Sequence, residues 1–211
     1  MIRIKDEIKK MYNFTPEDSC IFRLEVWRDM FVDYNSHTNL MSKNDVSLLY
    51  EKHVLDSLSL VLFDGFKDGI KLLDVWCGGG FPSIILAIFF PNVEIVAMDS
   101  IGKKTTFLKL VRDKLSLHNF EVINSRIENY PPLNADIITN RAVGKISDVW
   151  NFSKKHLKNG GYFVSYKALT AKEEAKNASD KFKELGNLKF IPYNLPLSEN
   201  FVRELVVFQK R

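Results

Sequence analysis

Hydrophobic positions between residues 71 and 166 form short apolar runs that alternate with segments of helical spacing. Such runs are typical of β-strands buried on both faces. The predicted strands are Lys71–Val75, Val93–Asp99, Phe120–Asn124, Asp136–Thr139 and Tyr162–Tyr166. The predicted helices between them are Phe81–Phe90, Gly102–Leu115, Ile127–Tyr130 and Ile146–Leu157. This alternation favours an α/β fold, in which a mostly parallel sheet carries helices on both faces.

The end of the chain follows a different pattern. The segment 158–161 predicts a helix stop and a turn, and a polar helix is predicted at Ala171–Leu185. Two last apolar runs, Leu188–Tyr193 and Phe201–Phe208, are expected to pair as antiparallel strands, with Pro192 and Pro196 in or near their link. The sheet should therefore close with a terminal antiparallel strand.

The first 66 residues have a helical pattern. A short helix is expected at Ile4–Phe14, and the next should begin with Thr15 as its N-cap and Pro16 at its first helical position. Residues 35–39 are expected to break that helix, and a further helix should run from Ser42 to Leu62. We therefore expect residues 1–66 to form a helical extension and residues 67–211 to form the α/β domain.

Composition narrows the class of protein. With 211 residues, 45% of them hydrophobic, the chain suits one compact domain with a small extension. The longest near-apolar run, Phe81–Phe90, is far shorter than the roughly 20 residues of a membrane helix. The first residues lack the apolar core of a signal peptide, and Cys20 and Cys77 are too few for a disulfide scaffold. We expect a cytoplasmic protein with no membrane partner and, because its four histidines lie far apart, no metal site.

Charge is unevenly distributed. Residues 1–64 carry a net charge of −3, whereas residues 65–211 carry +7. A basic later portion is compatible with a polyanionic partner. Charge alone leaves open the simpler interpretation of a lysine-rich, solvated surface.

A glycine turn joins the first predicted strand to its helix. The strand ends near Asp74, residues 78–80 are all glycine, and the helix is entered through Pro82. The next strand ends in Asp99. Strand, glycine turn, helix, strand and acid is the plan of a nucleotide-binding βαβ unit, which predicts a cofactor that contains adenosine.

The glycine pattern leaves two cofactor classes to weigh. Gly78-x-Gly80-x-x-Ser83 nearly matches the dinucleotide fingerprint, so a nicotinamide-dependent dehydrogenase stays an alternative. The serine at the third glycine position, the acid at Asp74 and the helical extension favour S-adenosylmethionine instead. Asp74 would then orient the methionine amine, the turn Gly78–Gly80 would let the backbone come close to the cofactor, Asp99 would bind the ribose hydroxyls, and Glu128 would frame the adenine.

Several motifs together resemble those of the guanine-N7 methyltransferases of small-subunit (16S) ribosomal RNA, also called glucose-inhibited division protein B. The resemblance runs from about Asn39 to Arg211. It rests on Asn39-Leu40, Lys52-His53-Val54-Leu55-Asp56-Ser57-Leu58, Leu72-Leu73-Asp74-Val75, Gly78-x-Gly80-Phe81-Pro82, Met98-Asp99-Ser100-Ile101-Gly102-Lys103-Lys104, Ser125-Arg126-Ile127-Glu128 and Asn140-Arg141-Ala142-Val143. It implies a Rossmann-like class I methyltransferase fold with a seven-stranded sheet. It also implies cofactor contacts at Trp76, Phe81, Ile127, Glu128 and Arg141, with Arg141 also facing the substrate.

One residue departs strongly from the family pattern, which has glycine where this chain has Trp76. The indole either blocks the cofactor or points away into the protein, and other methyltransferases carry a bulky aromatic residue at this place. We expect the cofactor to bind, provided that the φ angle of Trp76 is negative. Ser83, where the family has another glycine, is a milder change.

The sequence lacks the motifs of other methyl-transfer reactions, which is consistent with the reaction that the resemblance implies. Guanine N7 is an unprotonated lone pair, so attack on a sulfonium methyl group requires no general base. Methylation of pyrimidine carbon 5 would need a cysteine nucleophile, but Cys77 lies in the glycine turn and is interpreted as structural. The motif for methylation of exocyclic amines has proline after an Asn or Asp at this place, but Arg141 follows Asn140 here. Arg141 is the residue expected to position the substrate, the alternative being an ion pair with an acid such as Glu128.

The RNA-binding residues are predicted by charge and position near one rim of the sheet: Lys103, Lys104, Arg126, Lys145 and Lys167. His53 is interpreted as a packed or hydrogen-bonded helix residue. We expect a monomer that acts on small-subunit ribosomal RNA or on its ribonucleoprotein particle. A small-molecule methyltransferase and an RNA-binding relative with impaired cofactor binding stay open as alternatives.

Overall fold

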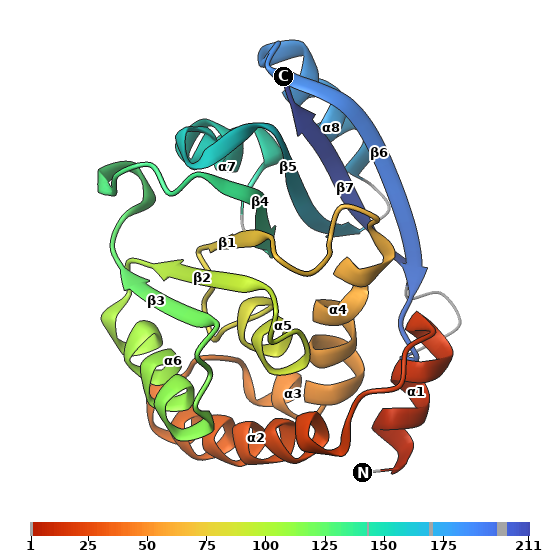
Figure 1. Ribbon diagram of the computed structural model, residues 1–211, viewed down its shortest axis with the longest axis vertical. Helices are drawn as coiled ribbons and strands as arrows, with labels where there is room; N and C mark the ends of the chain where they lie inside the picture. Colours follow the sequence, from red (N-terminus) through yellow and green to blue (C-terminus); the bar gives the residue numbers. More distant parts are fainter. Residues whose placement is uncertain (1, 143, 169–170, 198–201) are drawn as a thin grey trace.

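The computed structural model describes residues 2–142, 144–168, 171–197 and 202–211, with side chains described from residue 4. In this part of the chain seven strands form one sheet in the order β3-β2-β1-β4-β5-β7-β6 (Figure 1). Strands β1 to β5 are parallel, and β7 runs antiparallel to both β5 and β6. The strands are β1 Lys71–Val75, β2 Glu94–Asp99, β3 Phe120–Asn124, β4 Ala135–Arg141, β5 Leu157–Ala168, β6 Leu185–Asn194 and β7 Val202–Lys210.

The predicted parallel sheet and its closing antiparallel pair are therefore confirmed. The turn predicted at residues 158–161 is wrong, because this segment lies inside β5, where Gly160 has a φ of +77°. Pro192 lies in β6, near the end of that strand at Asn194, and Pro196 follows the strand. A proline fits there because β6 is an edge strand and needs no donor on its outer side. Phe201 and Val143, part of two predicted segments, lie outside the described residues.

Helices cover both faces of the sheet. Side chains alternate along β1, so Leu72 faces one core and Leu73 the other. The first core is closed by α5 (Ser83–Phe89), α6 (Gly102–Leu115) and the N-terminal helices, and the second by α7 (Ile146–Ser153) and α8 (Lys172–Lys181) (Figure 1). Single turns η3 (Ile127–Asn129) and η4 (Lys154–His156) complete these layers.

The N-terminal region differs in detail from the expectation. Its elements are α1 Ile2–Tyr12, α2 Asp18–Thr38, α3 Lys43–Val46, η1 Leu49–Val54, α4 Leu55–Leu58 and η2 Ser59–Leu62. Thr15 does not cap α2, because the first helical hydrogen bonds reach the carbonyl of Glu17. The helix ends only at Asn39, which adopts a left-handed conformation. The helix expected from Ser42 to Leu62 is four short pieces, of which η1 is a π-helix.

Aromatic packing attaches the N-terminal helices to the sheet domain. Trp27 and Phe31 of α2 are fully buried and lie edge-on against Phe81, with ring centroids 5.6 Å apart in both pairs. Phe31 also meets Phe107 of α6. Phe81 belongs to the glycine turn after β1, so the N-terminal helices pack directly against that turn.

Candidate functional site

The carboxyl ends of β1, β2, β3 and β4 bring most of the predicted site residues to one edge of the sheet. Asp74 lies in β1, Asp99 ends β2, Ile127 and Glu128 lie in η3 after β3, and Arg141 ends β4. Because these strands are parallel and adjacent, residues far apart in the sequence share this edge. Ligands of open α/β sheets bind at such edges.

Asp74 is a buried carboxyl group that is only half satisfied. Its Oδ2 accepts a hydrogen bond of 3.2 Å from the backbone N–H of Ser83, whereas its Oδ1 has no partner. Burial raises the pKa of Asp74 from 3.8 to about 7. Thr139, its register partner on β4, carries another buried oxygen without a partner. This pair of acceptors suits a donor with several N–H groups, such as an ammonium.

Asp99 braces the glycine turn. Its Oδ2 accepts from the backbone N–H of Gly78 at 3.0 Å and its Oδ1 from that of Ile101 at 2.9 Å. Lys104 Nζ lies 3.7 Å from the same carboxylate. The carboxylate is almost fully buried, so it fixes the turn after β1 relative to the end of β2.

The glycines of this turn differ in what they accommodate. At Gly80 a Cβ would lie 2.6 Å from Leu108 Cδ2, so glycine is needed there for packing against α6. At Gly78 a Cβ would find only the carbonyl oxygen of Trp76, at 4.0 Å. The space over Gly78 is therefore open, and a ligand could approach its backbone closely.

Trp76 does not meet the condition set by the sequence analysis, because its φ is +54° and not negative. A side chain in this left-handed region costs roughly 1–2 kcal/mol, which explains a preference for glycine. The indole lies edge-on to Phe152 of α7, with ring centroids 6.2 Å apart, and packs against the core on that face. The ring therefore points toward α7.

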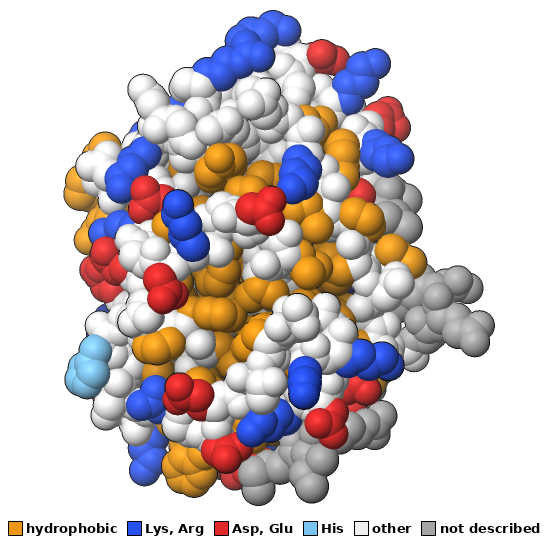
Figure 2. All heavy atoms as spheres, turned by 45° about the vertical axis from the view of Figure 1, so that its right-hand side comes forward, with side chains coloured by type: hydrophobic (Ala, Val, Ile, Leu, Met, Phe, Trp, Pro, Cys, Tyr) orange, Lys and Arg blue, Asp and Glu red, His pale blue; other side chains and the backbone are white. Residues whose placement is uncertain are grey.

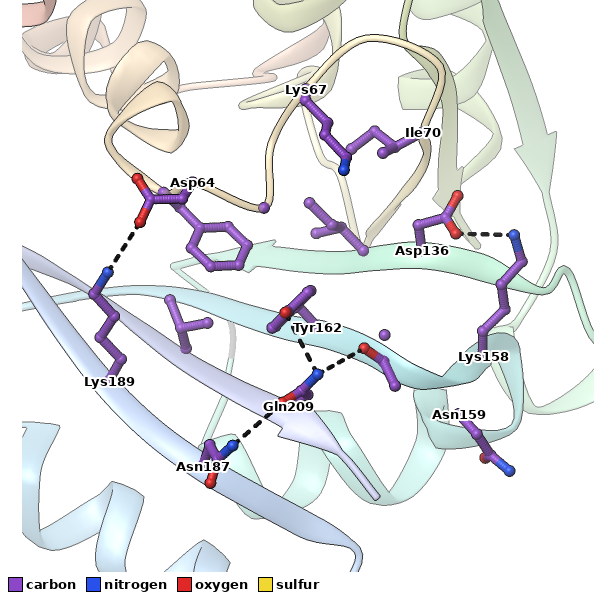
Figure 3. Close-up of a pocket in the computed structure, with 16 residues that line it drawn as sticks. Asp64, Lys67, Ile70, Asp136, Lys158, Asn159, Tyr162, Asn187, Lys189 and Gln209 are labelled. Atoms are coloured by element: carbon purple, nitrogen blue, oxygen red, sulfur yellow. Dashed lines mark hydrogen bonds and ion pairs between the residues drawn. The ribbon is translucent and has the colours of Figure 1, made fainter.

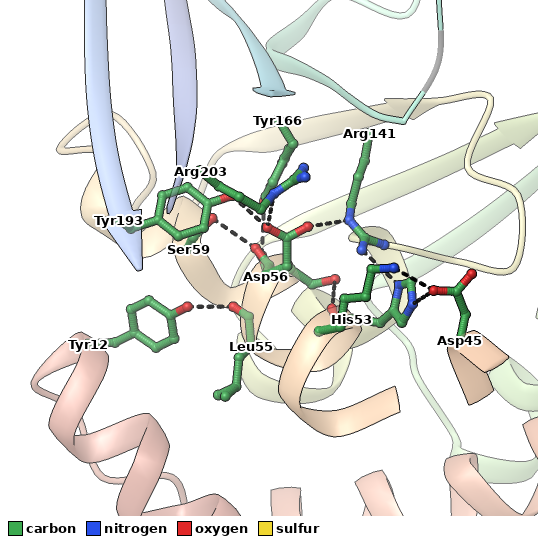
Figure 4. A network of polar contacts seen from close by, with 12 residues as sticks. Tyr12, Asp45, His53, Leu55, Asp56, Ser59, Arg141, Tyr166, Tyr193 and Arg203 are labelled. Atoms are coloured by element: carbon green, nitrogen blue, oxygen red, sulfur yellow. Dashed lines mark hydrogen bonds and ion pairs between the residues drawn. The ribbon is translucent and has the colours of Figure 1, made fainter. Parts of the chain in front are cut away.

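Arg141 is held by the N-terminal region. Its Nε donates to Asp56 Oδ2 at 2.5 Å, and its Nη2 lies 2.8 Å from His53 Nδ1 (Figure 4). The guanidinium also lies over the Phe81 ring, 5.5 Å from its centroid. An ion pair was the alternative considered for Arg141, but its partner is Asp56 rather than Glu128, whose side chain is exposed.

Asp56 is the residue that sequence reasoning missed. Its side chain is 1% exposed, and its Oδ1 accepts from Tyr193 Oη at 2.6 Å and lies 2.7 Å from Arg203 Nε. The signal was an acid inside the apolar stretch Val54–Leu58, since a carboxylate in such a position needs partners. The sequence could not name those partners because they lie more than 80 positions away.

Four of the predicted RNA-binding residues follow the carboxyl ends of strands and Lys167 lies within the end of β5, but their side chains are not equally available. Lys103 Nζ donates to the carbonyl of Thr38, and Lys104 is near Asp99. Arg126 and Lys145 are exposed. Lys167 pairs with Glu174 at 2.8 Å and also donates to the carbonyl of Gly144, so it is the least available of the five.

Two other chemistries find little support. Cys77 is a free, buried thiol whose pKa is raised well above 9 by burial, which disfavours the nucleophilic thiolate. Among the described residues, no three His, Cys, Asp or Glu side chains are grouped so that they could hold a metal ion.

No described helix combines the length and the hydrophobicity needed to cross a membrane.

A cavity of about 620 Å³ lies at the opposite, amino-terminal edge of the sheet (Figure 3). Its polar groups largely satisfy one another: Lys158 pairs with Asp136, and Gln209 bonds Tyr162 and the carbonyl of Gly160. Figure 2 shows the side of β6, where basic and acidic side chains surround a hydrophobic centre. Neither feature presents the single sign of charge that a polyanion would need.

Comparisons with known proteins show the family and the fold of the chain. The family model "GidB: rRNA small subunit methyltransferase G" matches residues 21–201. The ribosomal RNA small subunit methyltransferase G of Fusobacterium nucleatum is 37% identical over 199 residues, which cover 92% of this chain and 83% of that protein. Its counterpart in Lysinibacillus sphaericus is 34% identical over 90% of this chain and 82% of that protein. The solved structure of a SAM-dependent methyltransferase from Aquifex aeolicus has the same fold, with a TM-score of 0.57 at 17% identity over 78% of this chain and 93% of that chain.

Proposed function

Because the chain belongs to the GidB family of rRNA small subunit methyltransferases G, we propose that it transfers a methyl group from S-adenosylmethionine to N7 of a guanine in small-subunit ribosomal RNA. The observation that carries the proposal is the family match over residues 21–201, which includes the glycine turn and both acidic strand ends. The cofactor, when bound, supplies an electrophilic methyl group on a sulfonium.

The carboxyl edge of the sheet fits this cofactor. The unpartnered Oδ1 of Asp74 and the Thr139 hydroxyl would accept from its ammonium group. Asp99, already oriented by two backbone N–H groups, keeps lone pairs for ribose hydroxyls. The open space over Gly78 would admit the nucleoside. The backbone of Trp76 and Gly80 and the side chains of Phe81, Ile127 and Glu128 would border the site.

No general base is needed in this proposal, because guanine N7 carries no proton at neutral pH. The work of the protein is then to align N7, the methyl carbon and the sulfur, and to exclude water. Alignment of this kind lowers a barrier by about 7–11 kcal/mol. Arg141 is the positioning group proposed for the substrate side, since its guanidinium lies over the Phe81 ring beside the turn and its contacts with Asp56 and His53 leave other N–H groups free.

The remaining assignments follow from the same proposal. Residues 67–211 would form the catalytic domain, and residues 1–66 an extension that supports the glycine turn and Arg141. The basic residues at or after the strand ends, Lys103, Lys104, Arg126, Lys145 and Lys167, would contact RNA phosphates. The enzyme would act as a cytoplasmic monomer on the RNA or on its ribonucleoprotein particle.

Transfer of a labelled methyl group tests the proposal. Purified protein, labelled cofactor and ribosomal RNA from cells that lack a family member should yield 7-methylguanosine after digestion to nucleosides. The Asp99→Ala variant should lose transfer, whereas Asp113→Asn on the exposed side of α6 should retain it. Label in a small molecule instead would favour a small-molecule methyltransferase. RNA binding without any heat of cofactor association would favour a binding protein and overturn the proposal.

A further inference from the structure

The Arg141 side chain is fixed more firmly than its length would suggest. It is only 9% exposed, and three groups hold its guanidinium: Asp56 and His53, both seen in Figure 4, and the Phe81 ring. A free arginine side chain samples many rotamers, and ordering it has an entropic cost of about 2 kcal/mol. Here the folded protein has already ordered it before any ligand binds.

The contact with His53 defines the state of that imidazole. A guanidinium can only donate, so His53 Nδ1 must accept and the ring proton must lie on Nε2. Nε2 is buried and lies 3.5 Å from Asp45 Oδ1. Burial, and next the charge of Arg141, lower the pKa of His53 to about 4, so the imidazole is neutral near pH 7. A neutral His53 can keep accepting from Arg141.

Asp56 connects Arg141 to a second group of residues. One carboxylate oxygen takes Arg141, and the other takes the Tyr193 hydroxyl and faces Arg203. Asp56 therefore lies between two guanidinium groups, one at each carboxylate oxygen. The two halves of this network are separable, because different oxygens serve them.

The guanidinium keeps a free edge. Of its five N–H groups, the one on Nε and one on Nη2 are committed to Asp56 and His53, so three remain within the described structure. Such an edge matches an oxyanion, which accepts two parallel N–H bonds. Both ligands of the proposed reaction carry one: the cofactor has a carboxylate and the RNA has phosphates.

We propose that His53 and Asp56 are positioning residues that hold Arg141 so that its free edge binds an oxyanion of a ligand at the carboxyl edge of the sheet. The inference rests on the proposed function for the identity of the ligands. The orientation of Arg141 is a property of the protein alone, so it can be tested without any activity.

The variants His53→Leu and His53→Asn distinguish the role of His53 in positioning Arg141 from its role in packing. Leucine fills a similar volume but removes the acceptor, whereas the asparagine carbonyl oxygen can stand near the place of Nδ1. Misplacing a group by about 1 Å can cost 100-fold in rate, so we expect His53→Leu to lower kcat about 10- to 100-fold and His53→Asn to retain most of it. Asp56→Asn should resemble His53→Leu, because its amide would face another donor.

The matched control is Tyr193→Phe. It removes one buried hydrogen bond from the same carboxylate but leaves the oxygen that holds Arg141 unchanged. We expect it to lower the melting temperature as much as His53→Leu does, with kcat unchanged. Calorimetry with S-adenosylhomocysteine and the KM for RNA identify the oxyanion: a weaker cofactor-product affinity points to the carboxylate, and a raised KM for RNA points to a phosphate.

The guanidinium itself gives a readout that is independent of catalysis. In protein labelled with ¹⁵N-arginine, the Nη2–H signal that is lost in Arg141→Lys, whose proton is donated to His53, should exchange slowly with solvent in the wild type and in Tyr193→Phe. In His53→Leu it should exchange rapidly. Equal exchange in all three proteins, or equal loss of kcat in His53→Leu and Tyr193→Phe, would overturn the positioning role. If transfer is absent from the wild type while the exchange pattern is as expected, only the proposed function fails.

Discussion

The backbone N–H of Gly78 donates a 3.0 Å hydrogen bond to Asp99 Oδ2, which ties the turn after β1 to the end of β2. The other oxygen of the same carboxylate accepts from Ile101, at the start of α6. One buried side chain therefore sets the relative position of two loops that border the proposed cofactor site. Its structural role and its proposed role toward the ribose depend on the same orientation.

Replacing Asp99 with Asn should lower both the stability of the protein and its affinity for the cofactor product. The amide group cannot accept at both positions, so one backbone N–H loses its partner, at a cost of about 1–3 kcal/mol in the free energy of unfolding. Urea denaturation measures this loss, and calorimetry with S-adenosylhomocysteine should give weaker binding. Asp113→Asn, whose side chain is 67% exposed, is the control and should change neither quantity. Full stability and full affinity in Asp99→Asn would contradict the bracing role.

The variant Asp74→Asn should differ from the wild type in how its free energy of unfolding depends on pH. The pKa of Asp74 is about 7 in the folded protein, because of burial, against 3.8 as the ordinary value. Between these values the folded state binds a proton that the unfolded state does not, so the free energy of unfolding falls as pH rises from about 4 to 7 and then levels off. Asparagine does not titrate. From pH 5 to pH 8, without cofactor, the variant should therefore gain about 2–3 kcal/mol relative to wild type.

Asp136→Asn is the control for this measurement. Partial burial raises the pKa of Asp136, but hydrogen bonds from Lys158 and from the backbone of Lys71 outweigh burial and lower it below 3.8. Its carboxylate is therefore ionised in both states above pH 5. Urea denaturation at pH 5 and pH 8 should give the same difference from wild type at both values. A constant difference for Asp74→Asn as well would mean that Asp74 is ionised at pH 5.

The sheet could be predicted from sequence because its physical causes are local. Each of the five parallel strands contains a short apolar run, and Asp74 and Asp99 lie at or next to strand ends, where the parallel topology brings side chains together. The turn expected at residues 158–161 failed because Gly160 and Gly161 are also compatible with a long, irregular strand. Glycine marks where a turn is possible, not where one must occur.

The partners of Arg141 could not be predicted for the opposite reason. Asp56 and Arg141 are 85 positions apart, and His53 lies at the end of a π-helix that no sequence period indicates. Glu128, the acid named above as an example of an ion-pair partner, is exposed and makes no ion pair with Arg141. Contacts between residues so far apart depend on how the N-terminal helices pack against β4. The hydrophobic periodicity of either segment carries no information about that packing.

Gly80→Ala should destabilise the protein more than Gly69→Ala. Both glycines have positive φ, +95° and +81°, so alanine is strained by about 1 kcal/mol at each. At Gly69 a Cβ would have no neighbour within 4 Å, whereas at Gly80 it would lie 2.6 Å from Leu108. Overpacking adds about 1–3 kcal/mol, which urea denaturation of the two variants should measure as their difference. Equal losses would mean that Leu108 moves aside freely.

Trp76→Ala should be less stable than Trp76→Gly. Both variants lose the contact of the indole with Phe152, but only alanine keeps a Cβ at a φ of +54°. This strain of roughly 1–2 kcal/mol exceeds the entropic advantage of about 0.4–1 kcal/mol that alanine usually has over glycine. We expect a difference of about 1 kcal/mol in the free energy of unfolding. Calorimetry with S-adenosylhomocysteine should find binding retained in Trp76→Gly, since the indole points toward α7.

Tyr130 is the matched position for this comparison. It is also a partly buried aromatic residue that packs against the same core, but its φ is −92°. With no left-handed strain to relieve, Tyr130→Ala should be at least as stable as Tyr130→Gly. A reversal of stability order between the two positions is therefore the expected result. The same order at both would mean that the backbone at Trp76 relaxes to negative φ once the ring is removed, and that the indole itself imposes the turn conformation.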